Sequence, residues 1–284
     1  MNRKQARCVV ILVAFAFPSL GLVRVAVSER PEALVGDLAT LDEIANEFQS
    51  VPCKNGDRQQ AAMALLERMG APRDAITIQH YKNVDDIVVV KPGATQEKIV
   101  IGAHYDKVEA GCGAIDNWTG VVTVAHLYNT LRTKNLKKTL VFVLFGKEES
   151  GLVGSWAMTR AIDKADVAQY CAMVNIDSLG QAKPQVADNL STKKLESLAE
   201  IIAKNMKLPF AHAIIGGADA DSTPFIAHKI PAITIHGLSN NWQSILHSTH
   251  DQATAVDPKG VYAGYLLAFN VVNSIDESPC DAFR

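Results

Sequence analysis

The sequence lacks a basic stripe, internal repeats, low-complexity tracts and any apolar run of membrane-spanning length. Lys and Arg number 28 against 30 Asp and Glu, which gives a formal net charge of −2. Without clustered basic residues, no nucleic-acid partner is expected. The composition, 48% hydrophobic and 20% charged, instead suits one globular domain, which we place at residues 29–284.

Residues 1–28 form a separate leader segment. Basic residues precede an apolar run at residues 8–17, and small residues at positions 26–28 offer a cleavage point. This order is typical of a secretory signal peptide, and an uncleaved N-terminal anchor is the alternative. The run is short for a membrane span and is followed by Pro18, which favours the signal peptide. We therefore expect a secreted or periplasmic protein, with a membrane partner only if the leader stays attached.

Cysteine is scarce as well. Four cysteines follow the leader, and they allow three pairings between which the sequence does not choose: Cys53, Cys112, Cys171 and Cys280. Cys171 lies within an apolar strand pattern. We interpret it as a buried small hydrophobe rather than as a disulfide partner.

Strand and helix patterns alternate along the rest of the chain. Buried-strand runs and helical spacing follow one another, with strands expected at residues 75–80, 87–91, 98–103, 140–145, 171–176, 213–215 and 231–235, and helices at 38–48, 57–69, 121–131, 195–206 and 258–275. A further helix is expected to begin near Ser155 and another near Asp221. The alternation predicts an α/β fold, with a mostly parallel or mixed twisted sheet and helices on both faces.

The run at residues 140–145 is followed by two adjacent carboxylates, Glu148 and Glu149. Ligands of open α/β sheets bind at the carboxyl ends of the strands, where this pair is expected. Two neighbouring carboxylates repel each other unless a cation or a shared proton compensates them. The pair is therefore a candidate for one metal ligand and one proton-transfer group.

Other metal-ligand residue types stand at further strand ends and loops. His104 and Asp106 are two positions apart, so on a strand they face the same side, and Asp106 could hold the ring of a metal-bound His104. Asp116 lies in a glycine-rich loop, Asp177 follows another buried run, and His247 lies in a loop. Each alone has an ordinary structural explanation, but together they form a zinc-type ligand set that can hold two ions with one bridging carboxylate.

Five spaced motifs now stand in one order: His104-x-Asp106, Gly113-Ala-Ile-Asp116-Asn117-x-x-Gly120, Glu148-Glu149-x-Gly151-x-x-Gly154-Ser155, Asn175-Ile-Asp177 and His247-Ser-Thr-x-Asp251. This order resembles the cocatalytic zinc exopeptidases, family twenty-eight of the metallopeptidases, which include secreted bacterial aminopeptidases. The resemblance spans about residues 80–275. It implies the zinc-exopeptidase, phosphorylase/hydrolase-like fold.

The resemblance also implies two Zn²⁺ per chain. Asp116 would bridge them, His104 and Asp177 would complete the first site, and Glu149 and His247 would complete the second. His250, close to His247, is a competing ligand, but the family places its ligand directly before Ser or Thr. The family often has a cis peptide bond after the bridging aspartate.

The remaining roles also come from the resemblance. Glu148 would be the general base, and Asp106 would orient His104. Asp221 matches an Asp-x-x-Pro-Phe motif, although the usual following histidine is Ser222 here. Asp221 is therefore a candidate substrate-binding residue. Trp242 is a second candidate on a separate ground, since it lies in the loop before His247 and could line a substrate pocket. Packing of the loop is the alternative role for Trp242.

The expected function is a secreted di-zinc aminopeptidase. A zinc-bound hydroxide would attack the N-terminal peptide bond of peptides with a free amine, with Glu148 as the base. The alternative is a glutaminyl cyclase-like acyltransferase with one zinc, which the full ligand set disfavours. A binding module on an inactive peptidase fold would have lost ligands, and a carboxypeptidase or dipeptidase of this kind commonly carries an inserted dimerisation domain, for which residues 149–247 leave no room.

Overall fold

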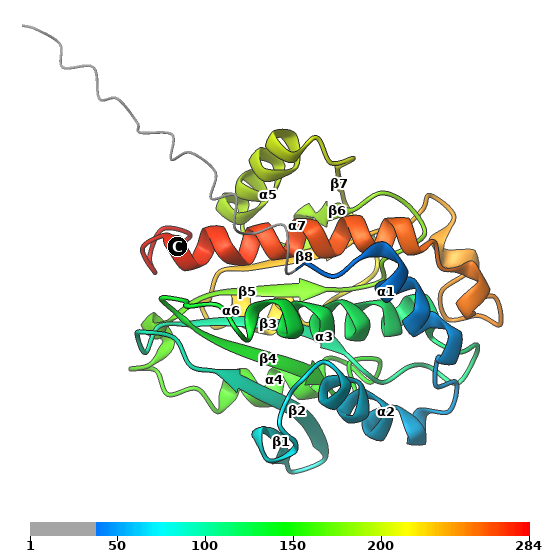
Figure 1. Cartoon of the computed structure of the whole chain (residues 1–284), viewed down its shortest axis with the longest axis horizontal. Helices are drawn as coiled ribbons and strands as arrows, with labels where there is room; N and C mark the ends of the chain where they lie inside the picture. Colours follow the sequence, from blue (N-terminus) through cyan, green and yellow to red (C-terminus); the bar gives the residue numbers. More distant parts are fainter. Residues whose placement is uncertain (1–37) are drawn as a thin grey trace, which may run out of the picture. The chain divides into compact units, whose positions relative to one another are not determined.

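The computed structural model describes residues 38–284, so the expected leader at residues 1–28 lies outside the described residues. A sheet of eight strands runs through this part of the chain (Figure 1). In chain order the strands are β1 (Ile76–Tyr81), β2 (Val84–Lys91), β3 (Lys98–His104), β4 (Thr139–Phe145), β5 (Tyr170–Ile176), β6 (Gln185–Ala187), β7 (Ala211–Ala213) and β8 (Ala232–His236). Their spatial order is β1-β2-β4-β3-β5-β8-β6-β7.

The centre of the sheet is parallel and its flanks are mixed. β4, β3, β5 and β8 pair in parallel, whereas β2 joins β4 and β6 joins β8 in antiparallel fashion. Parallel strands place their carboxyl ends at one edge, so the residues that follow β3, β4 and β5 meet there. The predicted mixed, mostly parallel α/β sheet is confirmed.

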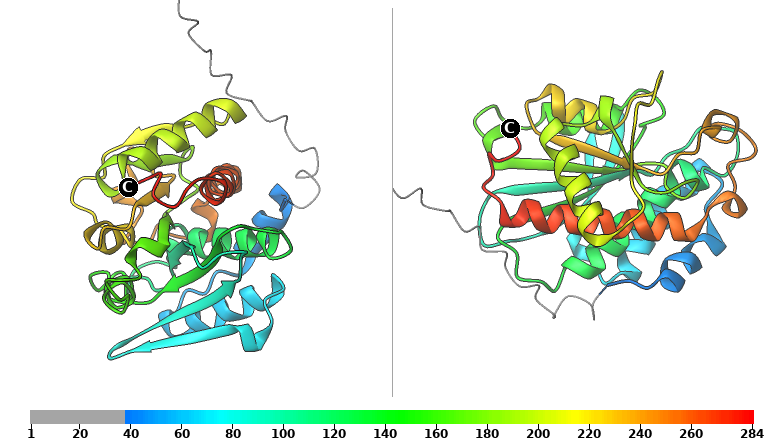
Figure 2. Two further views of the ribbon diagram at one scale, coloured as in Figure 1. Left: turned by 90° about the vertical axis from the view of Figure 1, so that its left-hand side faces the viewer. Right: turned by 90° about the horizontal axis from the view of Figure 1, so that it is seen from above.

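Helices cover both faces of this sheet (Figure 2). They are α1 (Leu41–Asn46), α2 (Asn55–Arg68), α3 (Thr119–Leu131), α4 (Val153–Arg160), α5 (Lys193–Met206), α6 (Ser222–Ala227) and α7 (Pro258–Glu277). Side chains of β4 alternate between the faces. Phe142 packs edge-on against Tyr128 of α3, whereas Phe145 contacts Phe225 of α6. No helix in the described range is both long and apolar enough to cross a membrane.

Two short strands differ from the expectations. β6 (Gln185–Ala187) was not anticipated, and β7 covers Ala211–Ala213 instead of residues 213–215. Three-residue strands are too short to show a periodic pattern, so their position depends on pairing with β8 and with each other.

The interpretation of Cys171 as an unpaired hydrophobe was wrong. Cys171 is fully buried, as expected, but it forms a disulfide with Cys280, and Cys53 pairs with Cys112. Cys280 lies beyond α7, where the chain returns to the start of β5. The Arg284 guanidinium donates a hydrogen bond to the Tyr170 carbonyl there. Cys171 and Cys280 are 109 positions apart, and they meet only because the chain returns to β5. No local sequence pattern predicts such a return.

Asp86 anchors the end of β4 from the neighbouring strand β2. Its side chain is completely buried, and its Oδ1 accepts a hydrogen bond of 2.9 Å from the Gly146 amide. Its Oδ2 has no partner among the described residues. Burial of this carboxyl group raises its pKa to about 7. From about pH 4 to pH 7 the folded chain keeps a proton that the unfolded chain has lost, so stability falls as pH rises through this window.

Asp86→Asn should remove this pH-dependent cost, because the amide oxygen still accepts the Gly146 hydrogen bond. We expect the variant to equal the wild type near pH 4 and to exceed its unfolding free energy at pH 8 by about 2–4 kcal/mol. Urea unfolding at both pH values measures this difference. Asp85→Asn, at a partly exposed position of β2, is the control. A stability difference that is the same at pH 4 and pH 8 would contradict the prediction.

Candidate metal centre

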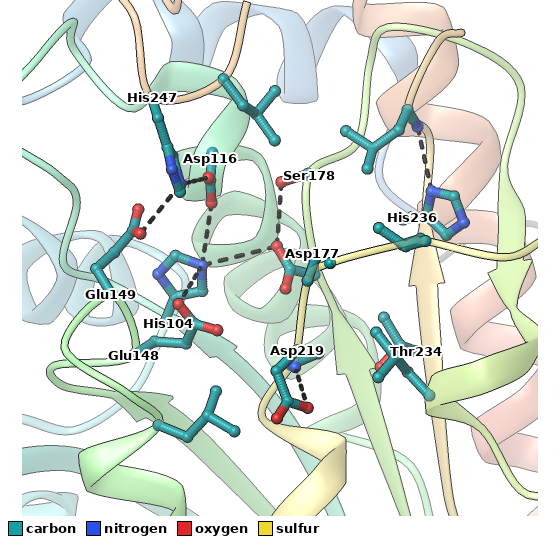
Figure 3. Close-up of a pocket in the computed structure, with 18 of the residues that line it drawn as sticks. His104, Asp116, Glu148, Glu149, Asp177, Ser178, Asp219, Thr234, His236 and His247 are labelled. Atoms are coloured by element: carbon teal, nitrogen blue, oxygen red, sulfur yellow. Dashed lines mark hydrogen bonds and ion pairs between the residues drawn. The ribbon is translucent and has the colours of Figure 1, made fainter. Parts of the chain in front are cut away.

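The predicted ligand residues meet at the carboxyl edge of the parallel strands (Figure 3). His104 is the last residue of β3, and Asp177 directly follows β5. Glu149 lies in the loop between β4 and α4. His247 comes from the loop that leads towards α7. Asp116 lies in η4, a π-helical turn (Ala114–Trp118) that directly precedes α3.

The Asp116 carboxylate lies between two imidazole rings. Its Oδ1 is 3.1 Å from Nε2 of His104, and its Oδ2 is 3.0 Å from Nε2 of His247 (Figure 3). Each oxygen therefore faces a different ring, which is the arrangement of a bridging carboxylate. Around each ring stands one further predicted ligand. Asp177 Oδ1 lies 3.6 Å from the His104 nitrogen, and Glu149 Oε2 lies 3.1 Å from the His247 nitrogen.

This donor set fits divalent metal ions. At this site two groups of three residues can hold an ion, namely His104 with Glu148 and Asp177, and Asp116 with Glu149 and His247. Within each group the ligand atoms lie within 4.8 Å of one another. Imidazole nitrogens and carboxylate oxygens are the ligand types of zinc. Oε1 of Glu149 is buried without a hydrogen-bond partner among residues 38–284, so it retains lone pairs for a cation. Glu148 lies 3.9 Å from His104 and can serve the first group as a ligand or as a base.

Electrostatics at the site favour positive charge. Hydrogen bonds to Asp116 and Glu149 raise the pKa of His247 to about 10. Burial opposes protonation of His104, but attraction to Glu148 and hydrogen bonds to neighbouring carboxylates outweigh it, and its pKa lies well above its usual value. The neighbouring carboxylates thus stabilise the protonated form of both imidazole rings. Metal ions would supply the same positive charge, and their binding would release those protons.

The two glutamates are less ready to ionise than free carboxylic acids. Burial raises the pKa of Glu148 well above its usual value, and the nearby carboxylates of Asp221 and Asp177 raise it further, although His104 opposes them. Burial also raises the pKa of Glu149, against a hydrogen bond from His247. A carboxyl group with a raised pKa takes up a proton more readily near neutral pH, which suits a general base.

Asp106 holds the glutamate loop as well as the histidine. Its carboxylate accepts hydrogen bonds from the backbone amides of Glu148, at 3.0 Å, and Glu149, at 3.3 Å. The ring of His104 is held by the Asp106 backbone carbonyl, which lies 3.2 Å from Nδ1, whereas the carboxylate is 3.7 Å away. Asp106 therefore links the ends of β3 and β4, a role that its spacing from His104 did not indicate.

Asp251 and Asn117 fix the turn that carries Asp116. The Asp251 carboxylate accepts hydrogen bonds from the amides of Ile115, at 2.7 Å, and Asp116, at 3.1 Å. Asn117 donates to the Ile176 carbonyl at the end of β5 and accepts from the Gly120 amide. The peptide bond between Asp116 and Asn117 is cis, as the family resemblance implied. Sequence reasoning named no role for Asp251, because only the fold brings it to this turn.

A cavity of about 460 Å³ opens beside the ligand cluster. Glu148 lines it, and so does Trp242, one of the two predicted substrate-binding residues. Most of the remaining wall is apolar: Leu152, Trp156, Leu190, Ile215, Leu238 and Leu246. Asp221, the other predicted residue, is completely buried, while its neighbours Asp219 and Ala220 line the cavity. The cavity can therefore receive an apolar group beside the polar cluster.

The remaining histidines near the site differ from the two in the cluster. His250 is exposed, and its ring contacts the Ser244 carbonyl and the Ser248 hydroxyl. The geometry thus favours His247 over His250 as the ligand. His236 ends β8 and lines the cavity, and burial lowers its pKa to about 4, so it is neutral at physiological pH.

Comparison with known proteins identifies the family. Residues 86–271 match the sequence model of Peptidase family M28. The chain belongs to this family. Its matched segment contains the ligand cluster and the loops that hold it, so the shared region and the candidate metal centre coincide. The resemblance inferred from the five spaced motifs is confirmed.

Among curated relatives, leucine aminopeptidase 1 of Trichophyton equinum is 26% identical over 227 residues, which cover 70% of this chain and 61% of the relative. The chain thus spans about three fifths of that protein's length. Among solved structures, a zinc aminopeptidase from Bacillus subtilis matches with a TM-score of 0.61 and 18% identity, covering 70% of this chain and 52% of that one. Glutaminyl cyclase of Porphyromonas gingivalis matches with a TM-score of 0.68 and 17% identity, covering 84% of this chain and 99% of that one. Both structures establish the fold alone.

Gly120 allows the first turn of α3 to approach the end of β5, and a methyl group there should break this contact. A Cβ at Gly120 would lie 2.5 Å from the Ile176 carbonyl oxygen and would also meet Oδ1 of Asn117. We expect Gly120→Ala to lower the unfolding free energy by about 2 kcal/mol or more. Gly56→Ala is the control, because a Cβ there meets no atom within 4 Å in helix α2. Equal thermal unfolding temperatures of the two variants would refute the prediction.

Proposed function

We propose that this chain is a secreted di-zinc aminopeptidase that hydrolyses the N-terminal peptide bond of peptides with a free amine. The main support is the position of the Asp116 carboxylate, whose two oxygens each lie within 3.1 Å of a different imidazole nitrogen. Membership of family M28 and the fold shared with a zinc aminopeptidase support this choice of reaction and metal.

Five residues would hold the metals, with Asp116 between them, His104 and Asp177 on one side, and Glu149 and His247 on the other. Zinc bound there would lower the pKa of a coordinated water towards about 7 and polarise a substrate carbonyl. The ligands fall into two groups, and each group contains its own imidazole. This division supports two ions rather than one.

Glu148 is the proposed general base. It lines the cavity, and its carboxylate lies within 3.9 Å of the His104 nitrogen, so it lies beside the residues that would hold the metals. It would take the proton from that water and deliver it to the leaving amine. Asp106 would keep Glu148 in place through the hydrogen bond to its backbone amide.

The acidic cluster also accounts for a free N-terminus as the substrate end. A terminal ammonium group is attracted by carboxylates in a partly buried site, whereas a terminal carboxylate is repelled. The apolar part of the cavity, which includes Leu152 and Trp242, would receive the first side chain. Peptide substrates are therefore the proposed partners.

Secretion or export to the periplasm is proposed from the leader at residues 1–28 and from the disulfides. Cys53–Cys112 and Cys171–Cys280 are both formed. Structural disulfides are typical of oxidising compartments outside the cytosol. The leader pattern and the disulfide pairs support export independently of each other.

The reaction class can be tested by blocking either the N-terminal amine or the C-terminal carboxyl group of the substrate. Leucyl peptides with a free amine should be cleaved, N-acetylated peptides should not, and C-terminal amidation should have little effect. A chelator should abolish cleavage, and added Zn²⁺ should restore it. Mass spectrometry of the products gives the cleaved bond. Cleavage of acetylated but not amidated peptides would make the chain a carboxypeptidase. One zinc per chain with cyclisation of N-terminal glutamine would support the cyclase instead.

Glu148→Gln and Glu149→Gln should separate the two glutamate roles. Glu148→Gln keeps the shape of the side chain but removes its basicity, so kcat should fall by about 10²-fold or more while two zinc ions stay bound. Glu149→Gln should weaken one zinc and recover partly with excess metal. Metal analysis beside kinetics tests this, with Glu109→Gln outside the ligand set as the control. Near-normal kcat in Glu148→Gln would exclude Glu148 as the base.

A further inference from the structure

A buried arginine lies behind the metal centre. Arg58 belongs to α2 and has an exposed fraction of 0%. Within residues 38–284 no carboxylate forms an ion pair or a hydrogen bond with its guanidinium group. Burying a cation without such a partner is costly unless several hydrogen bonds compensate it.

The guanidinium group donates only to backbone carbonyls. Nε donates to the Tyr105 carbonyl, Nη1 to the carbonyls of Pro52 at 3.1 Å and Cys112 at 2.9 Å, and Nη2 to the Gly113 carbonyl at 3.2 Å. Its central carbon, Cζ, also lies over the ring of Trp118, at 5.1 Å from the ring centroid. One side chain of α2 thus joins three separate backbone segments.

Two of these segments carry metal-ligand candidates. Tyr105 directly follows His104 and precedes Asp106. Gly113 begins the turn that carries Asp116, and Trp118 ends it. The guanidinium group therefore spans the two stretches of backbone from which the 3.1 Å contact between His104 and Asp116 is made. It leaves the ligand side chains themselves free to face the cavity.

Its charge also faces the acidic cluster. Burial lowers the pKa of Arg58 to about 10, and the nearby carboxylates of Asp116, Asp106 and Asp251 oppose that shift. The group stays charged at neutral pH. It therefore supplies a fixed positive charge behind carboxylates that would otherwise repel one another more strongly.

We propose that Arg58 is a positioning residue of the metal centre, which sets the spacing between the backbone segments of His104 and Asp116. The proposal rests on the metal centre of the proposed function. Through Arg58, helix α2 would influence metal affinity although it contributes no ligand. The planar fork of the guanidinium group matters here, because three carbonyl-bearing segments converge on its fixed N–H directions.

Lysine should not replace it. An ammonium group keeps the charge but is a compact point on a flexible stem, and it cannot donate to all four carbonyls at once. Arg58→Lys thus separates geometry from charge. Arg58→Gln removes the charge and keeps a planar group with two donors. Arg68→Lys is the matched control, because Arg68 lies on the same helix and forms an exposed ion pair with Glu47.

The experiment measures metal binding by the purified mature chain, without reference to peptidase activity. Zinc affinity is obtained by competition with a chromophoric chelator, and Co²⁺ substitution gives a visible spectrum that reports ligand geometry. Circular dichroism at 20 °C checks folding. We expect Arg58→Lys and Arg58→Gln to bind zinc about 10-fold or more weakly, with an altered Co²⁺ spectrum, as changes outside the direct ligands commonly do. Arg68→Lys should match the wild type.

Three outcomes would overturn the assignment. Wild-type zinc affinity and Co²⁺ spectra in Arg58→Lys, even with lowered thermal stability, would reduce Arg58 to a general structural residue. Loss of folding in both Arg58 variants at 20 °C would lead to the same conclusion. An equal loss of affinity in Arg68→Lys would show that any arginine of α2 has this effect. If the wild type itself binds no zinc, the proposed function fails, whereas only differences between variants bear on Arg58.

Discussion

Repulsion among the carboxylates around Asp116 is the constraint on which the rest of the structure depends. Asp116, Glu148, Glu149 and Asp177 converge at one edge of the sheet in a partly buried space. Such a cluster is stable only when positive charge compensates it. The two imidazole rings and Arg58 provide that charge from the protein, and metal ions are the natural further source. The demand for a cation and the proposed hydrolysis thus depend on the same arrangement.

The scaffold holds this cluster mainly through the backbone. Asp106 binds the amides of the glutamate loop, Asp251 binds those of the Asp116 turn, and Asn117 links that turn to β5. None of these bonds uses a ligand atom of the cluster's histidines. The side chains that would bind metal are therefore positioned by groups that do not compete for it, which leaves their oxygens and nitrogens available.

The arrangement also places two environments side by side. The parallel strands end at the polar cluster, whereas the cavity beyond it is lined by apolar residues from several loops. A peptide end fits this division, because its charged amine and its first side chain have opposite solvation needs. The proposed specificity for N-termini follows from this contrast.

The sequence by itself determined the α/β fold, because strand periodicity is a local feature, and its spaced motifs named the candidate ligand residues that the fold brings together. Only the tertiary structure decided what depends on distant partners. Cys171 pairs with Cys280 across 109 positions, Arg58 reaches Gly113, and Asp251 reaches Ile115. Arg58 lies outside the spaced motifs and resembles any surface charge in sequence, and the motif that ends in Asp251 does not show which groups its carboxylate binds. The role of either residue appears only when the fold removes water and leaves backbone groups as its partners.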